Sequence, residues 1–183
     1  MILSSILAGI CIGLGNIMYL MIENKILGAV IFSCGLLAIR LYKLDLFTGK
    51  TQFIFTNQYS PQYYLLILLG NIVGIIGARL ISNIPEEIIV NVVQAKNNLT
   101  VVKLLISAMW CGALMSLATY KDTPLWISSL CVAAFLISGF NHCIANGFYL
   151  LDGLNLPKWI ITVIGNLLGG ALVNGNLCDT SKK

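Results

Sequence analysis

Long apolar runs alternate with short polar interruptions along the whole chain. Six such runs can be marked, at about 2–22, 26–44, 63–81, 101–120, 125–138 and 156–173. A helix needs roughly 20 apolar residues to cross the hydrocarbon core of a bilayer, so the pattern predicts six membrane-spanning helices. The polar stretch from Ser82 to Asn98 is expected to form the one long loop.

Two of the runs are interrupted close to their ends. Polar residues and a glycine interrupt the second run at 45–50, and a brief apolar stretch follows at 51–55. Polar residues and a glycine also interrupt the fifth run, at 139–142. The third and sixth runs contain near-copies of one motif, Leu-Gly-Asn-Ile-Val-Gly at 69–74 and Ile-Gly-Asn-Leu-Leu-Gly at 164–169. Each half of the chain therefore has three spans, an odd number, so the second half has to lie inverted in the membrane.

These features predict an all-α integral membrane protein with a single transmembrane domain over 1–183. It would consist of two inverted three-helix repeats, each with a broken middle helix. The boundaries are repeat one 1–82, loop 83–99, repeat two 100–174 and tail 175–183. The alternative is that the interruptions are ordinary loops between eight or more short elements. The polar clusters are too short, and the resumption at 51–55 is too brief to span, for that alternative to be attractive.

Composition supports a membrane protein and excludes several other classes. Hydrophobic residues make up 58% of the 183 residues and charged residues only 10%, whereas soluble domains carry about 25% charged residues. The net charge of +4 comes without any dense basic cluster, so no nucleic-acid partner is expected. The cysteines are scattered with no Cys-x-x-Cys pair, and no nucleophile–base pair is apparent, so we expect no metal, no cofactor and no enzymatic activity.

The two interruptions are the predicted binding region. Unpaired backbone groups at membrane depth are tolerated only where protein or a water-filled cavity satisfies them. The N–H groups at the start of each resumed half-helix carry partial positive charge, and two such ends facing each other would attract an anion. The first interruption contains Thr48, and the second contains His142, the single histidine of the chain. His142 could be a hydrogen-bonded core residue, but its place after Gly139 in a spanning segment, with Asn141 and Asn146 near, favours a functional role.

Four ordered motifs resemble one known family. They are Ala8 to Gly15, Phe32 to Gly49 with its Asp-Leu-Phe-Thr-Gly ending, Gly139 to Asn146, and the Gly165-Asn166-x-x-Gly169-Gly170 pattern. Across nearly its whole length the sequence resembles the formate/nitrite transporter family. The resemblance implies an aquaporin-like arrangement and a homopentamer in which each protomer has its own pore. It also implies transport of small monovalent anions in a multi-pass cell-membrane protein, as in the bacterial inner membrane.

The resemblance assigns roles to individual residues. His142 matches the family's central pore histidine and Thr48 the threonine of its omega loop. The apolar constrictions would be formed by Phe32, Leu36, Leu46, Phe47 and Phe135. In the second interruption Asn141 replaces an acidic residue of the family pattern. Gly112 replaces an asparagine that usually faces the histidine, and Lys50 replaces the asparagine that ends the omega-loop motif. Lys50 and Lys121 are the candidates for a vestibule charge, Lys121 being the nearest to the family's vestibule lysine.

The predicted function is passage of a weak-acid anion such as formate, nitrite, hydrosulfide or a short carboxylate. A proton, supplied through His142 or taken from bulk water, would let the substrate cross the apolar constrictions as the neutral acid, because a buried charge is costly. Two alternatives remain open. One is a channel for neutral solutes, which the uncharged Asn141 and Gly112 favour. The other is a membrane subunit that conducts nothing and only binds partners.

Overall fold

The computed structural model describes residues 1–56 and 58–174. Four of the described helices are long and apolar enough to cross a membrane, namely α1 (Ile2–Met21), α4 (Pro61–Leu80), α6 (Val101–Thr119) and α9 (Leu156–Asn174). Two more, α2 (Lys25–Leu41) and α7 (Leu125–Ile137), are the shorter first parts of the broken helices. The six predicted spans, the second and fifth of them broken, are thereby confirmed.

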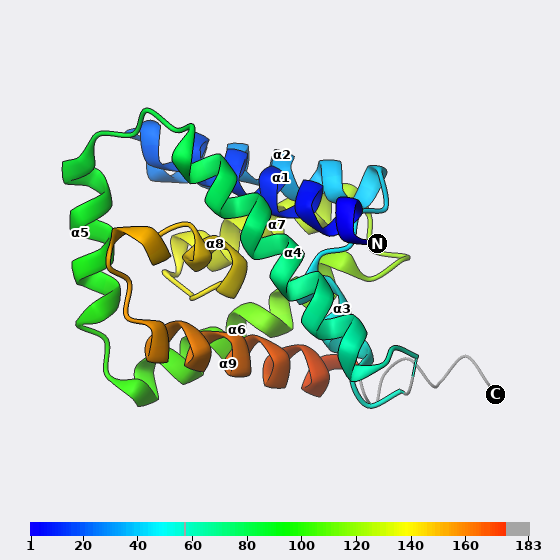
Figure 1. Ribbon diagram of the computed structural model, residues 1–183. Coiled ribbons are helices and arrows are strands. Elements are labelled where there is room, and N and C mark those ends of the chain that lie inside the picture. The colour runs from blue at the N-terminus through cyan, green and yellow to red at the C-terminus, as the bar shows by residue number, and fades with distance from the viewer. Residues whose placement is uncertain (57, 175–183) are drawn as a thin grey trace.

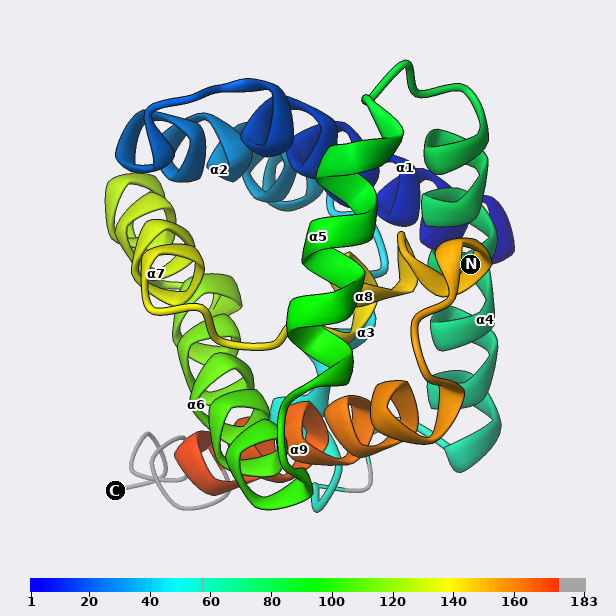
Figure 2. The same cartoon turned by 90° about the vertical axis from the view of Figure 1, so that its left-hand side faces the viewer.

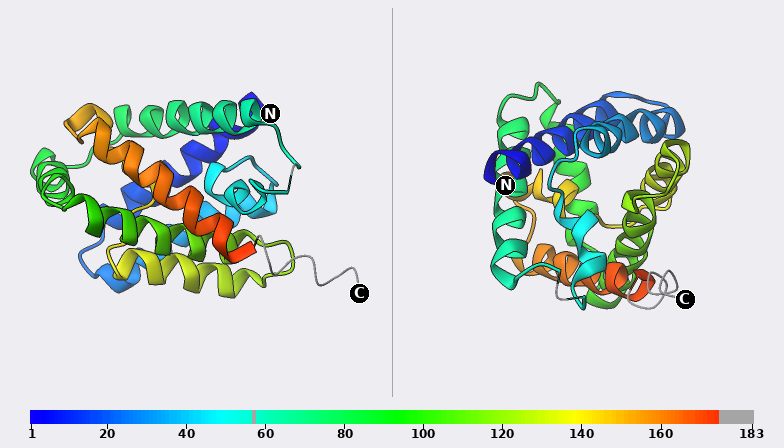
Figure 3. Two further views of the ribbon diagram at one scale, coloured as in Figure 1. Left: turned by 90° about the horizontal axis from the view of Figure 1, so that it is seen from below. Right: turned by 90° about the vertical axis from the view of Figure 1, so that its right-hand side faces the viewer.

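The long helices surround two short ones (Figure 1). Viewed from one end, α1, α2, α7, α6, α9 and α4 enclose α3 (Phe47–Lys50) and α8 (Cys143–Gly147), and α5 (Glu86–Asn97) crosses in front of them (Figure 2). From the opposite end the same helices frame α3 (Figure 3). The 3-10 turns η1 (Thr51–Phe53) and η2 (Leu150–Asp152) continue the two short helices. The two predicted interruptions thus lie at the centre of the molecule.

Small residues bring the outer helices together in two equivalent pairs. Helix α1 packs on α4 and helix α6 on α9. A Cβ atom on Gly9 would overlap the backbone of Asn71, and one on Gly112 would overlap the backbone of Asn166. Such close backbone approach is the usual role of glycine between membrane helices. The near-copied motifs of the third and sixth runs therefore make the same packing contact in both halves.

Both broken helices end in the same way. The backbone of Gly139, with φ of 67°, ends α7 in the left-handed conformation. The N–H of Gly139 donates to Leu136 O, and the N–H of Phe140 donates to Phe135 O, the two bonds of a Schellman motif. At the end of α2 the left-handed residue is Lys43, with φ of 53°. The same local turn, made once with glycine and once with lysine, stops each helix inside the membrane domain.

The segment 83–99 departs from expectation because it contains the helix α5 and is not an irregular loop. Glu86 and Glu87 lie in the first turn of α5 and Lys96 in its last, which suits the helix dipole. Ile89 and Val93 are one turn apart and buried. The hydropathy pattern missed this helix because only one narrow face is apolar. The tail 175–183 lies outside the described residues.

Candidate functional site

Two asparagines from the near-copied motifs fix the starts of the short helices. Asn71 Oδ1 accepts a 2.8 Å hydrogen bond from Phe47 N, and Asn71 Nδ2 donates to the carbonyl oxygens of Ser5 and Asp45. In the second half, Asn166 Oδ1 accepts a 2.7 Å hydrogen bond from Cys143 N. Asn166 Nδ2 donates to the carbonyl oxygens of Ala108 and Asn141. The two halves use the same three bonds, which is the clearest atomic sign of the internal repeat.

These bonds change the expected picture of the half-helix ends. The N–H groups of Phe47 and Cys143 are already satisfied by asparagine side chains, and that of Ala145 donates to His142 Nδ1. These three N–H groups are therefore not available to an incoming anion, and a site built from backbone N–H groups would have to use the other N–H groups of the short helices.

Thr48 and His142 join the two broken helices at the centre. Thr48 Oγ1 lies 2.9 Å from His142 Nε2, and both residues are buried. His142 Nδ1 accepts the backbone N–H of Ala145 at 3.0 Å, so the imidazole caps helix α8. A nitrogen that accepts a hydrogen bond carries no proton, so the network assigns the imidazole proton to Nε2, which donates to Thr48 Oγ1.

Apolar side chains lie against this pair. The ring of Phe135 stacks on the His142 imidazole with centroids 5.6 Å apart, and Phe32 meets Phe135 edge-on at 5.9 Å. Leu36, Leu46 and Phe47 are also buried in the same core. All five predicted constriction residues are thus buried in one core, and Phe135 among them contacts His142 directly.

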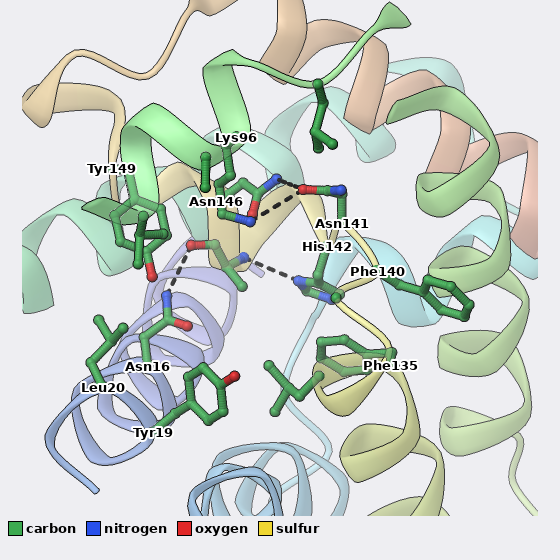
Figure 4. A pocket seen from close by; sticks show the side chains of 16 residues that line it. Asn16, Tyr19, Leu20, Lys96, Phe135, Phe140, Asn141, His142, Asn146 and Tyr149 are labelled. Carbon is green, nitrogen blue, oxygen red and sulfur yellow. Dashed lines mark hydrogen bonds between the residues drawn. The ribbon is translucent and has the colours of Figure 1, made fainter. Parts of the chain in front are cut away.

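A first cavity of about 390 Å³ reaches His142 from the end covered by α5. His142, Asn141, Asn146 and Phe135 line it together with Lys96 (Figure 4). Lys96 Nζ donates to Asn141 Oδ1 at 3.2 Å. Burial lowers the pKa of Lys96 to about 8. Lys96 is therefore a cation at the mouth of the site that sequence analysis did not select.

A second cavity of about 710 Å³ opens near the other end of the molecule. Its lining includes Leu46, Lys50 and Lys121, with Arg40 and Lys43 beside them. Helix α6 begins beside the first cavity, after Leu99, and ends at the second with Thr119. The two predicted vestibule lysines therefore lie together, but in the cavity that His142 does not line.

The lysines of the second cavity differ in their surroundings. Lys50 Nζ lies 3.8 Å from the Asp45 carboxylate and 5.3 Å from the centre of the Tyr59 ring. Lys121 pairs with Asp122 at 3.9 Å, both side chains being largely exposed. Exposed pairs of this kind contribute little to stability. In both pairs, however, a carboxylate partly offsets the charge of the lysine.

Comparison with known proteins identifies the family. The family model described as formate/nitrite transporter matches residues 1–178. This chain belongs to the formate/nitrite transporter family. Its members are channels and transporters, so the protein is a multi-pass membrane transport protein and not an enzyme.

Individual relatives agree with this assignment. The sequence is 25% identical over 188 residues to an uncharacterized transporter, YrhG, of Bacillus subtilis strain 168, covering 83% of this chain and 70% of that protein. The fold is similar to a pentameric formate channel solved with formate bound, with a TM-score of 0.76, 21% identity, and coverage of 99% of this chain and 94% of that one. The fold is also similar to that of an ion channel of the formate/nitrite transporter (FNT) family, with a TM-score of 0.76 and 22% identity, covering 99% of this chain and 88% of that chain.

Membership of the formate/nitrite transporter family also bears on Gly112. The sequence comparison placed Gly112 where the family has an asparagine that faces the histidine. In this protein Gly112 packs against the Asn166 backbone of α9. Its neighbour Cys111 is also buried. Gly112 is therefore a packing residue and does not itself face the cavity beside His142.

Proposed function

We propose that this protein carries small monovalent weak-acid anions, such as formate, nitrite, hydrosulfide or a short carboxylate, across the membrane. The observation that supports this most strongly is the Thr48–His142 hydrogen bond, with the Phe135 ring stacked on the imidazole and His142 lining a cavity that also holds a lysine. The lysine favours an anion in the cavity. The apolar residues beyond it disfavour a bare charge, because burying one costs several kcal/mol even after relaxation.

The substrate crosses the apolar region as the neutral acid. Lys96 attracts the anion into the first cavity, where burial makes the electrostatic attraction stronger than in bulk water. Protonation there removes the charge before the substrate passes Phe135 and Phe32. The Thr48 hydroxyl, which accepts from His142, keeps its own O–H to donate to the passing substrate.

The proton comes from water in the cavity and not from a store on His142. To become an imidazolium, His142 would have to take a proton on Nδ1 and lose the hydrogen bond from Ala145 N. Losing that bond would also uncap helix α8, at a cost of about 1 kcal/mol. Two proton sources were considered from the sequence, His142 and bulk water. The hydrogen bonds favour water, from which the anion takes a proton because the anion itself is basic.

The proposal also covers the oligomeric state of the protein and the membrane in which it lies. The solved formate channel with this fold is a pentamer, and large apolar side chains cover the outer helix faces of this chain, Trp110, Leu117 and Leu130 among them. We expect five copies, each with its own pore, in a bacterial inner membrane. Native mass spectrometry of the detergent-purified protein should give five times the 19.9 kDa chain mass.

Uptake into liposomes tests the function. Labelled formate, nitrite and hydrosulfide should enter vesicles that contain the protein faster than protein-free vesicles, and His142→Phe should reduce the rate. Osmotic swelling with uncharged solutes gives the comparison for a neutral-solute channel. Swelling without anion uptake would support that alternative, and no flux of any kind would support a non-conducting subunit.

A further inference from the structure

Helix α1 contributes one buried amide to the first cavity. Asn16 lines this cavity from α1, together with His142 and Phe135 of the second repeat. The side chain of Asn16 is only 3% exposed. A polar group buried at membrane depth has to bond to the protein or face a polar space inside it. The two ends of the Asn16 amide do one of these each.

The amide nitrogen of Asn16 is bonded to the second short helix. Asn16 Nδ2 donates to the carbonyl oxygen of Ala145 at 2.9 Å, as the dashed line in Figure 4 shows. Because a carbonyl oxygen only accepts hydrogen bonds, this contact settles which end of the amide is nitrogen. The N–H of the same Ala145 donates to His142 Nδ1. Asn16 and His142 are therefore fixed to one residue of α8.

The amide oxygen of Asn16 faces the cavity. No residue among 1–56 and 58–174 donates a hydrogen bond to Asn16 Oδ1. In that part of the chain every fully buried side-chain oxygen has a partner, so Asn16 Oδ1 is an atom that the cavity reaches. Figure 4 shows Asn16 across the cavity from His142 and Phe135. An amide oxygen suits an O–H donor and not an anion, since an anion would bring only further lone pairs.

The first repeat bonds its short helix without such an amide. Thr119 has the position on α6 that Asn16 has on α1, counted from the glycines of the two equivalent helix contacts. Gly49 is the third residue of α3, as Ala145 is of α8. The carbonyl oxygen of Gly49 accepts from Gln52 Nε2 at 2.8 Å, within the same break. The repeated fold therefore does not require an amide at this place on an outer helix.

We propose that Asn16 selects weak acids whose neutral form carries an O–H group, such as formic, nitrous or short carboxylic acids, over hydrogen sulfide. The anion takes a proton from water, which leaves as hydroxide to the bulk, and the new O–H donates to Asn16 Oδ1. A hydrogen bond to the neutral form favours that form, so Asn16 promotes neutralisation before the substrate passes Phe135. An S–H group is a weak donor and gains little. This inference rests on the proposed function and narrows its substrate class.

The test is the ratio of formate to hydrosulfide uptake into proteoliposomes at pH 7, with the rate of protein-free vesicles subtracted from each. Asn16→Leu has nearly the same size and lacks the acceptor, so the ratio should fall about 5-fold, as for the loss of one neutral hydrogen bond. Asn16→Gln keeps an amide and should stay within about 2-fold of the wild type. Loss of the bond to Ala145 alone would slow both substrates alike, so an unchanged ratio in Asn16→Leu would overturn the inference.

Two further variants complete the design. Asn16→Ala removes the acceptor without adding bulk and answers the question if Asn16→Leu does not fold. Thr119→Val is the matched control, since it removes a hydroxyl that lines the second cavity, and the ratio should not change. An equal fall in this control would contradict the inference. If the wild type takes up no anion, the proposed function fails. If it takes up formate but neither Asn16→Leu nor Asn16→Ala lowers the ratio, this inference alone fails.

Discussion

His142 Nε2 lies 2.9 Å from Thr48 Oγ1, although 94 residues separate the two side chains. The bond connects the starts of the two short helices, each of which begins where a longer helix stops inside the membrane domain. Because His142 Nδ1 is engaged by Ala145 N, the imidazole serves as a hydrogen-bond donor to Thr48. The predictions below begin from this contact and extend to the elements that position it.

Thr48→Val should impair transport. Valine has the shape of threonine but lacks the hydroxyl, so it leaves His142 Nε2 without its partner and the substrate without a donor. A buried polar group without a partner costs about 1–3 kcal/mol, so we expect formate flux to fall at least about 10-fold. Thr48→Ser, which keeps the hydroxyl, should retain flux within about 3-fold. Equal rates for the Val and Ser variants would show that the hydroxyl has no part in transport.

The protonation of His142 can be observed directly. The chain contains one histidine, so nitrogen NMR of the histidine-labelled protein gives the signals of a single ring. At pH 7 we expect a protonated Nε2 and an unprotonated Nδ1, since Nδ1 accepts from Ala145 N. Two protonated nitrogens at this pH would contradict the hydrogen-bond assignment and favour proton storage on the imidazole.

Lys96 should make anion affinity depend on pH. The pKa of Lys96 lies near 8 because of burial, so its positive charge is present below pH 8 and is lost as pH rises. At pH 9 roughly a tenth of the lysines remain charged. The KM for formate should therefore rise between pH 7 and 9 more steeply in the wild type than in Lys96→Arg, which stays charged. Identical profiles would exclude Lys96 as the titrating group.

Lys43→Gly should stabilise the fold. Lys43 adopts φ of 53°, whereas the equivalent turn in the second repeat uses Gly139. The left-handed conformation costs a residue with a Cβ atom roughly 1–2 kcal/mol, and glycine avoids most of this cost. Thermal unfolding in detergent should show a higher midpoint for Lys43→Gly. Lys43→Ala retains the Cβ atom and should show no such gain.

Gly112→Ala should destabilise the protein. A methyl group at this position would overlap the Asn166 backbone, and overpacking of a tight contact typically costs about 1–3 kcal/mol. Gly77→Ala is the matched control, because nothing lies within 4 Å of a Cβ at that position. The midpoint of thermal unfolding should fall only for Gly112→Ala. A fall in both variants would point to a general intolerance of helix substitutions.

Features of the fold that depend on membrane thickness were predictable from the sequence. The six apolar runs could be recognised as spans because each is about as long as a helix that crosses a bilayer. The polar interruptions near Thr48 and His142 showed where two of these helices break. The repeated Gly-Asn motifs indicated the two halves, although not that Asn71 and Asn166 bind the starts of the short helices. Local pattern could not show those bonds, because they join residues distant in the chain.

The sequence was less informative about charge. Lys96 lay in a segment expected to be a loop, and it meets Asn141 only because α5 folds across the end of the helix ring. Lys50 and Lys121 were selected through the family resemblance, yet they line the other cavity. The predicted constriction residues Phe32 and Phe135 could be selected only by family resemblance, since buried phenylalanines at helical spacing look the same in any core.

The most direct test is whether one proton accompanies each substrate anion. Vesicles containing the protein and an internal pH dye receive labelled formate while a potassium gradient with valinomycin sets the membrane potential. We expect internal acidification of one proton per formate and the same uptake rate at every potential, because the neutral acid carries no net charge. A bare anion would gain or lose about 2.3 kcal/mol per 100 mV. Uptake that follows the potential without acidification would contradict the account.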